Sequence, residues 1–267
     1  MKAGSLSLRG VAVRRCGRTI LQVDDLTIPP RAFVGVIGTN GAGKTTLLKV
    51  AAGLIRPSGG DVFIDDCNVT RLTPWRRCHI RKRIGYIPQS AEYNAELPFT
   101  LREVVAMGRT SVRPLLRRLN AQDMAIVDRW IETLGLADRS DQTFASCSGG
   151  EQQKALIARA MTQDPEIPML DEPCANLDFN WKHQISEIVE RLHHQTHVTV
   201  VMVSHDTSVL PGACTRIILL NAGRVVADGP ADEVLSPVTL GQAYHGRFQT
   251  LVVGDRRHTV NLSSEGR

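Results

Sequence analysis

Short apolar runs alternate with longer amphipathic segments along this chain. The runs AFVGVI (residues 32–37), IPML (167–170) and VTVVMV (198–203) each have the length and content of a buried strand. Helical spacing of apolar residues follows the first run in LLKVAAGL (47–54) and precedes the second in ALIARA (155–160). This alternation predicts an α/β fold with a mostly parallel sheet.

The ends of the chain show a different, strand-like pattern. Residues 1–30 and 61–69 contain short stretches in which apolar and polar residues alternate, which predicts an antiparallel β-subdomain. The segment RIILLNAGRVVAD (216–228) predicts a hairpin that turns at Asn221-Ala222-Gly223, with Gly223 at a positive φ.

The pattern becomes helical between Gln89 and about Gly149. A capping box of Thr100 and Glu103 opens the segment TLREVVAMG. The following NAQDMAIVDRWIETLG carries an apolar stripe at helical spacing, formed by Met124, Val127, Ile131 and Leu134. These features predict a helical insert within the α/β fold.

Composition excludes some functions and leaves others open. The 267 residues are 42% hydrophobic and 22% charged, which is ordinary for a globular protein. No apolar run approaches the roughly 18 residues that cross a bilayer, and the N-terminus lacks the apolar block of a secretory signal. The net charge of +5 is compatible with nucleic acid, a membrane surface or a phosphorylated ligand, and the six cysteines contain no Cys-x-x-Cys pair. We therefore expect an intracellular protein that is not itself a channel.

The segment GTNGAGKTT, directly after the first apolar run, has the pattern of a phosphate-binding loop. It matches G-x-x-x-x-G-K-[ST] and lies between a predicted strand and a predicted helix, which is the context that this motif requires. Glycines allow backbone amides to surround phosphate oxygens, the lysine reaches the β- and γ-phosphates, and the threonine hydroxyl binds Mg²⁺. The predicted cradle for ATP comprises Gly38, Thr39, Asn40, Gly41, Ala42, Gly43, Lys44, Thr45 and Thr46.

Two carboxylates end the second apolar run, at the edge of the sheet where α/β proteins bind ligands. Asp171 is predicted to hold Mg²⁺, and Glu172 to orient and deprotonate the attacking water. Because Pro168 lacks a backbone N–H, we expect strand pairing to begin no earlier than about this residue. His205, which follows the third run, is predicted to contact the γ-phosphate and Glu172. The absence of an Asn-Lys-x-Asp motif argues against a GTPase.

The stretch SCSGGEQQKALIARA (146–160) begins a helix with a pair of glycines, which is unfavourable unless something approaches the backbone closely. One interpretation is a capping box, in which Ser148 caps the helix and Glu151 reaches back to its amide. The second interpretation is a phosphate contact at the helix N-terminus. The two readings are compatible.

With GTNGAGKTT, SGGEQQ, IPMLDEP and SHD in its sequence, the chain closely resembles the ATP-binding subunit of ABC transporters over nearly its whole length. The resemblance implies an ATPase whose two copies pack head to tail around two ATP molecules. Ser148, Gly149, Gly150 and Glu151 of one subunit would then lie against the γ-phosphate held by the other.

The resemblance also implies roles for three further residues. Gln89 fits the glutamine loop, which contacts Mg²⁺ and senses the membrane partner, and Asp178 in ANLD fits the loop at the dimer seam. Arg15 takes the position where the family generally places an aromatic residue against adenine. A guanidinium can also stack on a base.

The resemblance implies a single ABC ATPase domain over residues 1–248 of P-loop NTPase fold, with a RecA-like, mostly parallel sheet. Its nucleotide-binding core and antiparallel β-subdomain occupy 1–89 and 150–230, an inserted α-helical subdomain occupies 90–149 with the signature at its end, and 231–267 form a C-terminal tail.

The segments PFTLREVVAMGR (98–109) and EVLSPVTLGQAYHG (233–246) are similar to the metal and metal-chelate importer branch. The implied protein is a peripheral ATPase on the cytoplasmic face of the cell (inner) membrane. It would bind permease subunits, act indirectly with a substrate-binding protein and bind no nucleic acid. An iron complex is the favoured cargo. The ATPase of an exporter, or a soluble non-transport ABC ATPase, remains an alternative.

Overall fold

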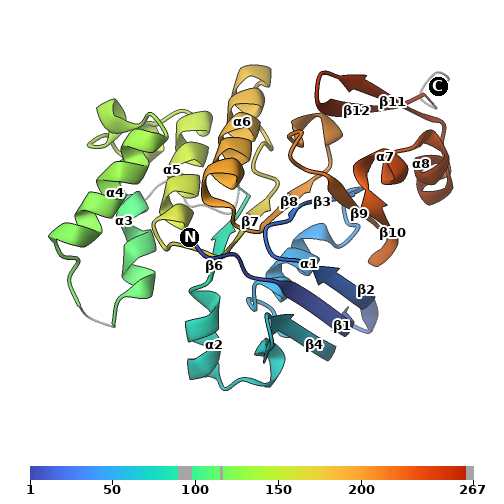
Figure 1. Cartoon of the computed structure of the whole chain (residues 1–267), viewed down its shortest axis with the longest axis horizontal. Coiled ribbons are helices and arrows are strands. Elements are labelled where there is room, and N and C mark those ends of the chain that lie inside the picture. Colours follow the sequence, from blue (N-terminus) through green and yellow to red (C-terminus); the bar gives the residue numbers. More distant parts are fainter. Residues whose placement is uncertain (90–97, 115–116, 263–267) are drawn as a thin grey trace.

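A ten-stranded mixed sheet forms the centre of the molecule in the computed structural model, which describes residues 1–89, 98–114 and 117–262. The strand order is β5-β4-β1-β2-β10-β9-β3-β8-β7-β6 (Figure 1). The strands are β1 (Leu6–Arg15), β2 (Arg18–Ile28), β3 (Phe33–Gly38), β4 (Gly59–Ile64), β5 (Cys67–Asn68), β6 (Ile84–Ile87), β7 (Ile167–Asp171), β8 (Val200–Ser204), β9 (Arg216–Asn221) and β10 (Arg224–Pro230).

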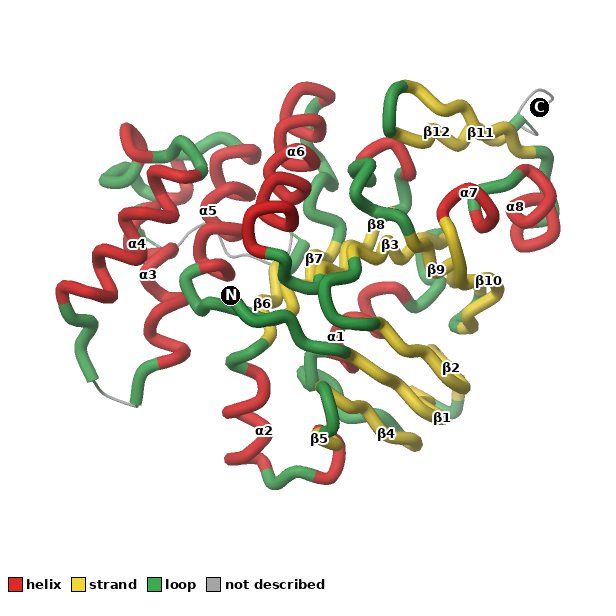
Figure 2. Tube along the Cα trace, viewed as in Figure 1, coloured by secondary structure: helices red, strands yellow, loops and turns green. Residues whose placement is uncertain are grey.

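Strands β9, β3, β8, β7 and β6 are parallel to one another, whereas β1, β2, β4 and β5 pair antiparallel. Figure 2 shows these two strand groups meeting at a curl in the sheet. The predicted hairpin is present: β9 and β10 join through Ala222 and Gly223, both at positive φ, as a tight two-residue hairpin turn requires.

Helices cover both faces of the parallel strands, with α1 on one side and α3, α5 and α6 on the other (Figure 1). In β3, Phe33 and Ile37 join one hydrophobic core, while Val34 and Val36 join the other. Burial on both faces explains why such strands read as continuous apolar runs. The helices are α1 (Lys44–Ala51), α2 (Pro74–Arg81), α3 (Leu101–Val112), α4 (Ala121–Thr133), α5 (Gly149–Met161), α6 (Phe179–Thr196), α7 (Ala231–Val234) and α8 (Pro237–Tyr244).

Three capping boxes begin the helices between β6 and β7. Thr100 with Glu103 caps α3, Asn120 with Asp123 caps α4, and Ser148 with Glu151 caps α5. The first and third are the boxes that the sequence predicts. No helix in the described part of the chain is long and apolar enough to span a membrane.

The structure corrects the expected start of the acidic strand. Strand β7 begins at Ile167, opposite Ile84 of β6, one residue before the predicted limit at Pro168. The proline is tolerated because ladder pairing with β8, on the other side, begins only at Met169.

The C-terminal region, which the sequence analysis describes only as a tail, contains regular secondary structure. After α8, strands β11 (Phe248–Val253) and β12 (Arg256–Asn261) form a separate two-stranded sheet. Its turn contains Gly254 at a φ of 65°. The Gly-Asp pair between two short runs was a usable hairpin signal.

Candidate active site

The phosphate-binding loop leaves β3 and turns into α1. Gly41 and Gly43 have φ values of 80° and 98°, a region that other residues rarely adopt. Gly38 is required for another reason: a Cβ there would lie 2.5 Å from the carbonyl oxygen of Leu220 in β9. The predicted loop therefore has the backbone freedom that a phosphate cradle needs, and it lies at the carboxyl edge of the parallel strands.

Lys44 is buried at the start of α1, with its ammonium group directed back over the loop. Its Nζ donates to the carbonyl oxygens of Gly38 at 3.0 Å and Thr39 at 3.1 Å, and lies 3.4 Å from Oε1 of Glu172. A buried cation is stable only when such partners satisfy it. These contacts hold the positive charge between the loop and the acidic end of β7.

Asp171, the last residue of β7, is 1% exposed and receives two hydroxyl hydrogen bonds. Thr45 donates to Oδ1 at 2.9 Å, and the Tyr86 hydroxyl donates to Oδ2 at the same distance. Tyr86 lies in β6 and was not among the predicted site residues. Its position three residues before Gln89 is the only sequence signal that could have suggested it.

Glu172 connects Lys44 to the histidine after β8. Its Oε2 lies 2.9 Å from Nδ1 of His205, and its backbone has a φ of 47°, unusual for a residue other than glycine. The backbone N–H of Glu172 bonds to Val203 of β8, which holds the residue in this conformation. Such conformations cost roughly 1–3 kcal/mol and cluster at functional sites.

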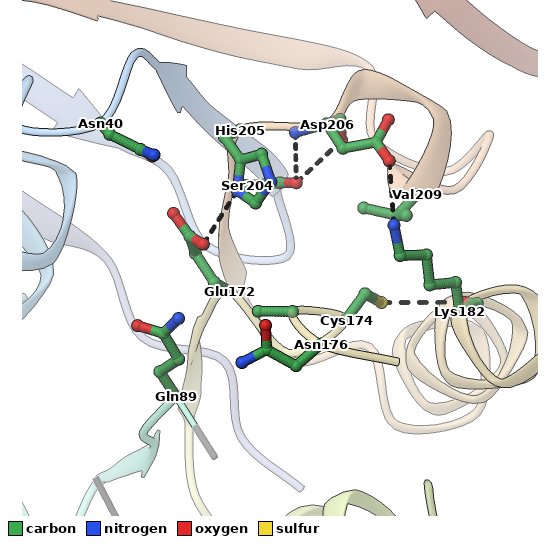
Figure 3. Close-up of a pocket in the computed structure, with 11 residues that line it drawn as sticks. Asn40, Gln89, Glu172, Cys174, Asn176, Lys182, Ser204, His205, Asp206 and Val209 are labelled. Carbon is green, nitrogen blue, oxygen red and sulfur yellow. Dashed lines mark hydrogen bonds and ion pairs between the residues drawn. The ribbon is translucent and has the colours of Figure 1, made fainter. Parts of the chain in front are cut away.

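A cavity of about 410 Å³ opens beside this pair (Figure 3). Figure 3 shows the side chains of Glu172, His205 and Gln89 converging there from three different segments. The cavity is lined by Asn40, Gln89, Glu172, Cys174, Ala175, Asn176, Lys182, Ser204, His205, Asp206 and Val209. Of the predicted site residues, Asn40, Gln89, Glu172 and His205 thus meet at one cavity, and Lys44 contacts it through Glu172.

Several residues of this cavity were not predicted. Lys182 from α6 lies 3.6 Å from the carboxylate of Asp206. Burial acts to raise the pKa of Asp206, but hydrogen bonds from Ser208 and the charge of Lys182 outweigh it and lower that pKa. Burial raises the pKa of Cys174 to about 12, so its thiol stays protonated at neutral pH. Lys182 and Ser208 thus hold Asp206, the residue after His205, in place.

The SGG helix start is not part of the cavity. Ser148 and Gly149 are exposed, and Gly150 is buried against Trp181 of α6, so that a Cβ there would lie 1.9 Å from the indole. Within one chain, close approach of Trp181 is therefore a reason for glycine at position 150. Glu151 completes the capping box and also pairs with Arg139 at 3.2 Å.

Like Asp171 and most of the phosphate-binding loop, two further predicted residues lie outside the cavity lining. Asp178 is the N-cap of α6 and accepts a hydrogen bond from the backbone of Trp181. Arg15 is exposed at the end of β1, opposite Arg18. The adjoining strand β2 does approach the loop, since the Ile20 carbonyl would lie 3.0 Å from a Cβ on Gly43.

The donor set at the end of β7 fits a magnesium ion. Mg²⁺ prefers oxygen ligands and is usually held by one or two carboxylates together with substrate phosphates. The hydroxyl of Thr45 and the carboxylate of Asp171 lie side by side, and the Gln89 amide lines the adjoining cavity. No group of three or more His, Cys, Asp or Glu residues in the described ranges could hold a metal without such help.

The chain is similar to several known proteins. A family model described as "ABC transporter" matches residues 21–175. A cobalamin import ATP-binding protein of Halobacterium salinarum is 36% identical over 91% of the chain, which spans only 59% of that relative's length. A manganese transport system ATP-binding protein of Halalkalibacterium halodurans is 31% identical, over 87% of this chain and 89% of the relative.

Among solved structures, a dimeric ATP-binding cassette bound to ADP and phosphate has a TM-score of 0.74 and 27% identity. The likeness covers 84% of this chain and 98% of that one. It confirms the predicted fold class, an α/β P-loop NTPase fold with a mostly parallel core.

Proposed function

Because the chain belongs to the ABC transporter family, we propose that it is the ATP-hydrolysing subunit of a membrane importer for a metal ion or metal chelate. ATP-binding domains of this family are ATPases, which supports the predicted enzyme class. The observation that carries the proposal is the contact of Lys44 and His205 with the two carboxylate oxygens of Glu172 beside one cavity.

In the proposed reaction, the loop from Gly38 to Thr46 holds the phosphates and Lys44 neutralises charge that develops on the γ-phosphate. Glu172 takes a proton from the attacking water, whose oxygen forms a bond to the γ-phosphorus as ADP leaves. His205 fixes the orientation of Glu172 through the 2.9 Å contact at Nδ1, which leaves Nε2 available for the γ-phosphate.

We further propose that Thr45, Asp171 and Gln89 hold Mg²⁺ when ATP is bound. The ion would neutralise charge on the β- and γ-phosphates. Thr45 and Asp171 are already side by side, so this chain's own contribution is to keep both oxygens fixed at the end of β7.

We propose that two copies, or a copy and a paired ATPase subunit, form the complete site. Ser148 and Gly149 are exposed at the N-terminus of α5, so they are available to a second subunit. Gly150 and Glu151 would support that contact from the first turn, Asp178 would lie at the seam, and Arg15 would contact adenine. The dimeric form of the solved relative supports this arrangement.

The names of the relatives support the class of cargo. They are called cobalamin import and manganese transport proteins, both for metals or metal complexes. We propose an iron complex as the first cargo to test, delivered by a substrate-binding protein to permease subunits. The chain would lie at the cytoplasmic face of the membrane. Uptake of the labelled cargo should fall when the chain is removed; increased accumulation would favour an exporter.

Purified Glu172→Gln tests the catalytic proposal. Removing a general base lowers the rate about 10²–10⁴-fold, while ATP binding should persist. Light scattering of this variant should show a monomer without ATP and a dimer with ATP. Hydrolysis at the wild-type rate would refute the role of Glu172, and a monomer at saturating ATP would refute ATP-driven dimerisation of the isolated chain.

A further inference from the structure

Helix α2 is unusual because it projects from the body beside β5 and buries none of its residues (Figures 1 and 2). Pro74 opens it, and the side chain of Thr73 caps it by accepting from the backbone of Arg76. The half-buried Ile80 packs against the core, and a short helix held by so little apolar contact gains little from packing.

Some basic side chains of this region have polar partners within the chain, and others have no ion pair. Arg77 donates to the carbonyl oxygens of Thr70 and Leu72, and Arg83 pairs with Asp65 and Glu166. In contrast, Arg76, Arg81 and Lys82 form no ion pair with any described residue. Helix α2 itself contains no acidic residue. Two exposed cations, Arg76 and Arg81, therefore lie on one projecting helix, and the half-buried Lys82 is its C-cap.

Two exposed apolar side chains lie on this helix and on the loop beside it. Trp75 is 75% exposed on α2, and Leu54 is 43% exposed on the loop between α1 and β4. The loop and α2 adjoin, because Cγ of Arg81 lies 3.6 Å from the position of a Cβ on Gly53. Arg56 on the same loop is also exposed. We define the α2 surface as Leu54, Arg56, Trp75, Arg76, Arg81 and Lys82.

We propose that the α2 surface binds the headgroups of an anionic lipid membrane. Cations attract lipid phosphates, and an indole ring is favoured at the membrane interface, where its apolar body and its N–H meet different surroundings. A single indole and one leucine do not form the row of stacking aromatics that single-stranded nucleic acid requires. The proposal goes beyond the ATPase function, because it needs no permease and no nucleotide.

The test is sedimentation of the purified chain with vesicles of phosphatidylcholine, with and without 30% phosphatidylglycerol. We expect binding only to the anionic vesicles, and weaker binding in high salt. Each basic residue near such a surface contributes about fivefold to the partition coefficient, so the triple variant Arg76→Gln, Arg81→Gln, Lys82→Gln should bind about 100-fold more weakly. Its ATPase rate should equal that of the wild type, which shows that the variant folds.

A matched control removes the same charge from exposed arginines elsewhere, as Arg117→Gln, Arg118→Gln, Arg191→Gln. This variant should bind vesicles nearly as well as the wild type. Vesicles should also shift the indole fluorescence of the wild type to shorter wavelength, and Trp75→Phe should lose that shift.

Equal losses in the two triple variants would overturn the proposal, because the attraction would then be that of net charge alone. Binding to duplex DNA as tight as to vesicles, without a fluorescence shift, would assign the surface to a phosphate polymer instead. If the wild-type chain binds the anionic vesicles but does not hydrolyse ATP, that result would count against the proposed function and leave this inference intact.

Discussion

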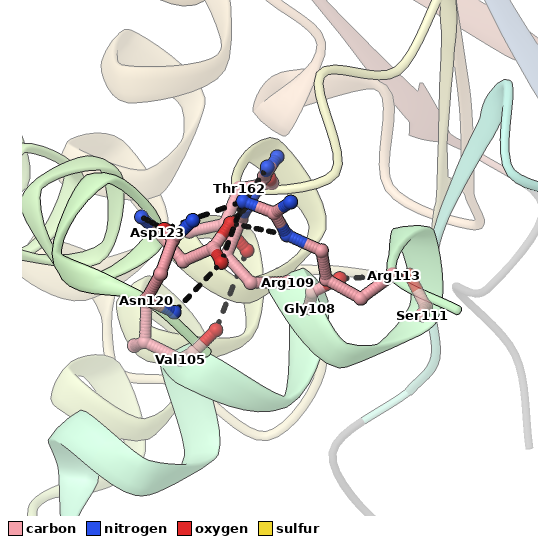
Figure 4. Close-up of polar contacts among 8 residues, drawn as sticks. All are labelled: Val105, Gly108, Arg109, Ser111, Arg113, Asn120, Asp123 and Thr162. Carbon is pink, nitrogen blue, oxygen red and sulfur yellow. Dashed lines mark hydrogen bonds and ion pairs between the residues drawn. The ribbon is translucent and has the colours of Figure 1, made fainter. Parts of the chain in front are cut away.

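Two buried aspartates, one in the sheet and one among the helices, accept hydrogen bonds from different kinds of donor. Asp171 accepts hydrogen bonds from two neutral hydroxyls, those of Thr45 and Tyr86. Asp123 of α4 is 0% exposed and pairs with two guanidinium groups, those of Arg109 and Arg113 (Figure 4). Hydroxyl partners satisfy hydrogen bonds without bringing a positive charge, whereas guanidinium groups bring one each.

The polar residues around Asp123 connect the three helices α3, α4 and α5. Arg109 of α3 reaches both Asp123 and the carbonyl oxygen of Thr162 at the end of α5, and Asp123 also closes the capping box with Asn120. Gly108 permits this packing, since a Cβ there would lie 2.0 Å from the carbonyl oxygen of Arg159. A buried carboxylate with guanidinium partners is thus structural here, and one with hydroxyl partners lies where the reaction is proposed to occur.

Of the changes to these two aspartates, Asp171→Asn should have the larger effect on hydrolysis. The change keeps the size of the side chain but removes a charge that we propose to act on the nucleotide-bound metal. We expect the hydrolysis rate to fall roughly 10²–10³-fold, the scale seen when one charge-stabilising group is lost, with a small change in Tm. A steady-state ATPase assay with a thermal melt measures both. A near-normal rate would mean that Asp171 is as structural as Asp123.

The matched change Asp123→Asn should have the reverse profile. Removing one partner of a buried ion pair leaves Arg109 and Arg113 without their counter-charge, and we expect Tm to fall by roughly 10 °C. At a temperature where the variant is folded, its ATPase rate should match that of the wild type. An unchanged Tm with a reduced rate would reverse our assignment of the two carboxylates.

Lowering the pH should also test the structural role of Asp123, with a smaller effect than substitution. Hydrogen bonds from Arg113, then from Asn120 and Arg109, lower the pKa of Asp123 to about 2, against an ordinary value of 3.8. Because the folded-state pKa is the lower one, the stabilisation is fully present above about pH 4 and is lost as the pH falls toward 2. The difference in Tm between the wild type and Asp123→Asn should therefore shrink over this range. A constant difference would show that the charge of Asp123 contributes nothing.

Local patterns were sufficient for elements whose cause is local. The phosphate loop was predictable because glycine spacing and the flanking apolar runs are all within one segment, and both predicted capping boxes formed because their partners are three residues apart. Helix α2 and the β11–β12 hairpin were missed. Neither has the long apolar pattern on which such predictions depend.

Contacts between distant segments could not be predicted from local sequence patterns. Nothing in the sequence near Asp171 indicates Tyr86, which lies 85 positions away, and nothing near Gly150 indicates Trp181. These pairs meet because parallel strands bring their carboxyl ends to one edge and because α5 and α6 pack on the same face of the sheet.

The sequence by itself was enough to predict which residues bind phosphate and which acts as a base, because those properties belong to the side chains and to short-range backbone geometry. Tertiary structure alone decided which carboxylates stand near hydroxyls and which near guanidinium groups. It also decided the strained backbone of Glu172, and which arginines remain exposed on α2. The physical reason is that charge, burial and hydrogen bonding depend on neighbours, and most of these neighbours are distant in the chain.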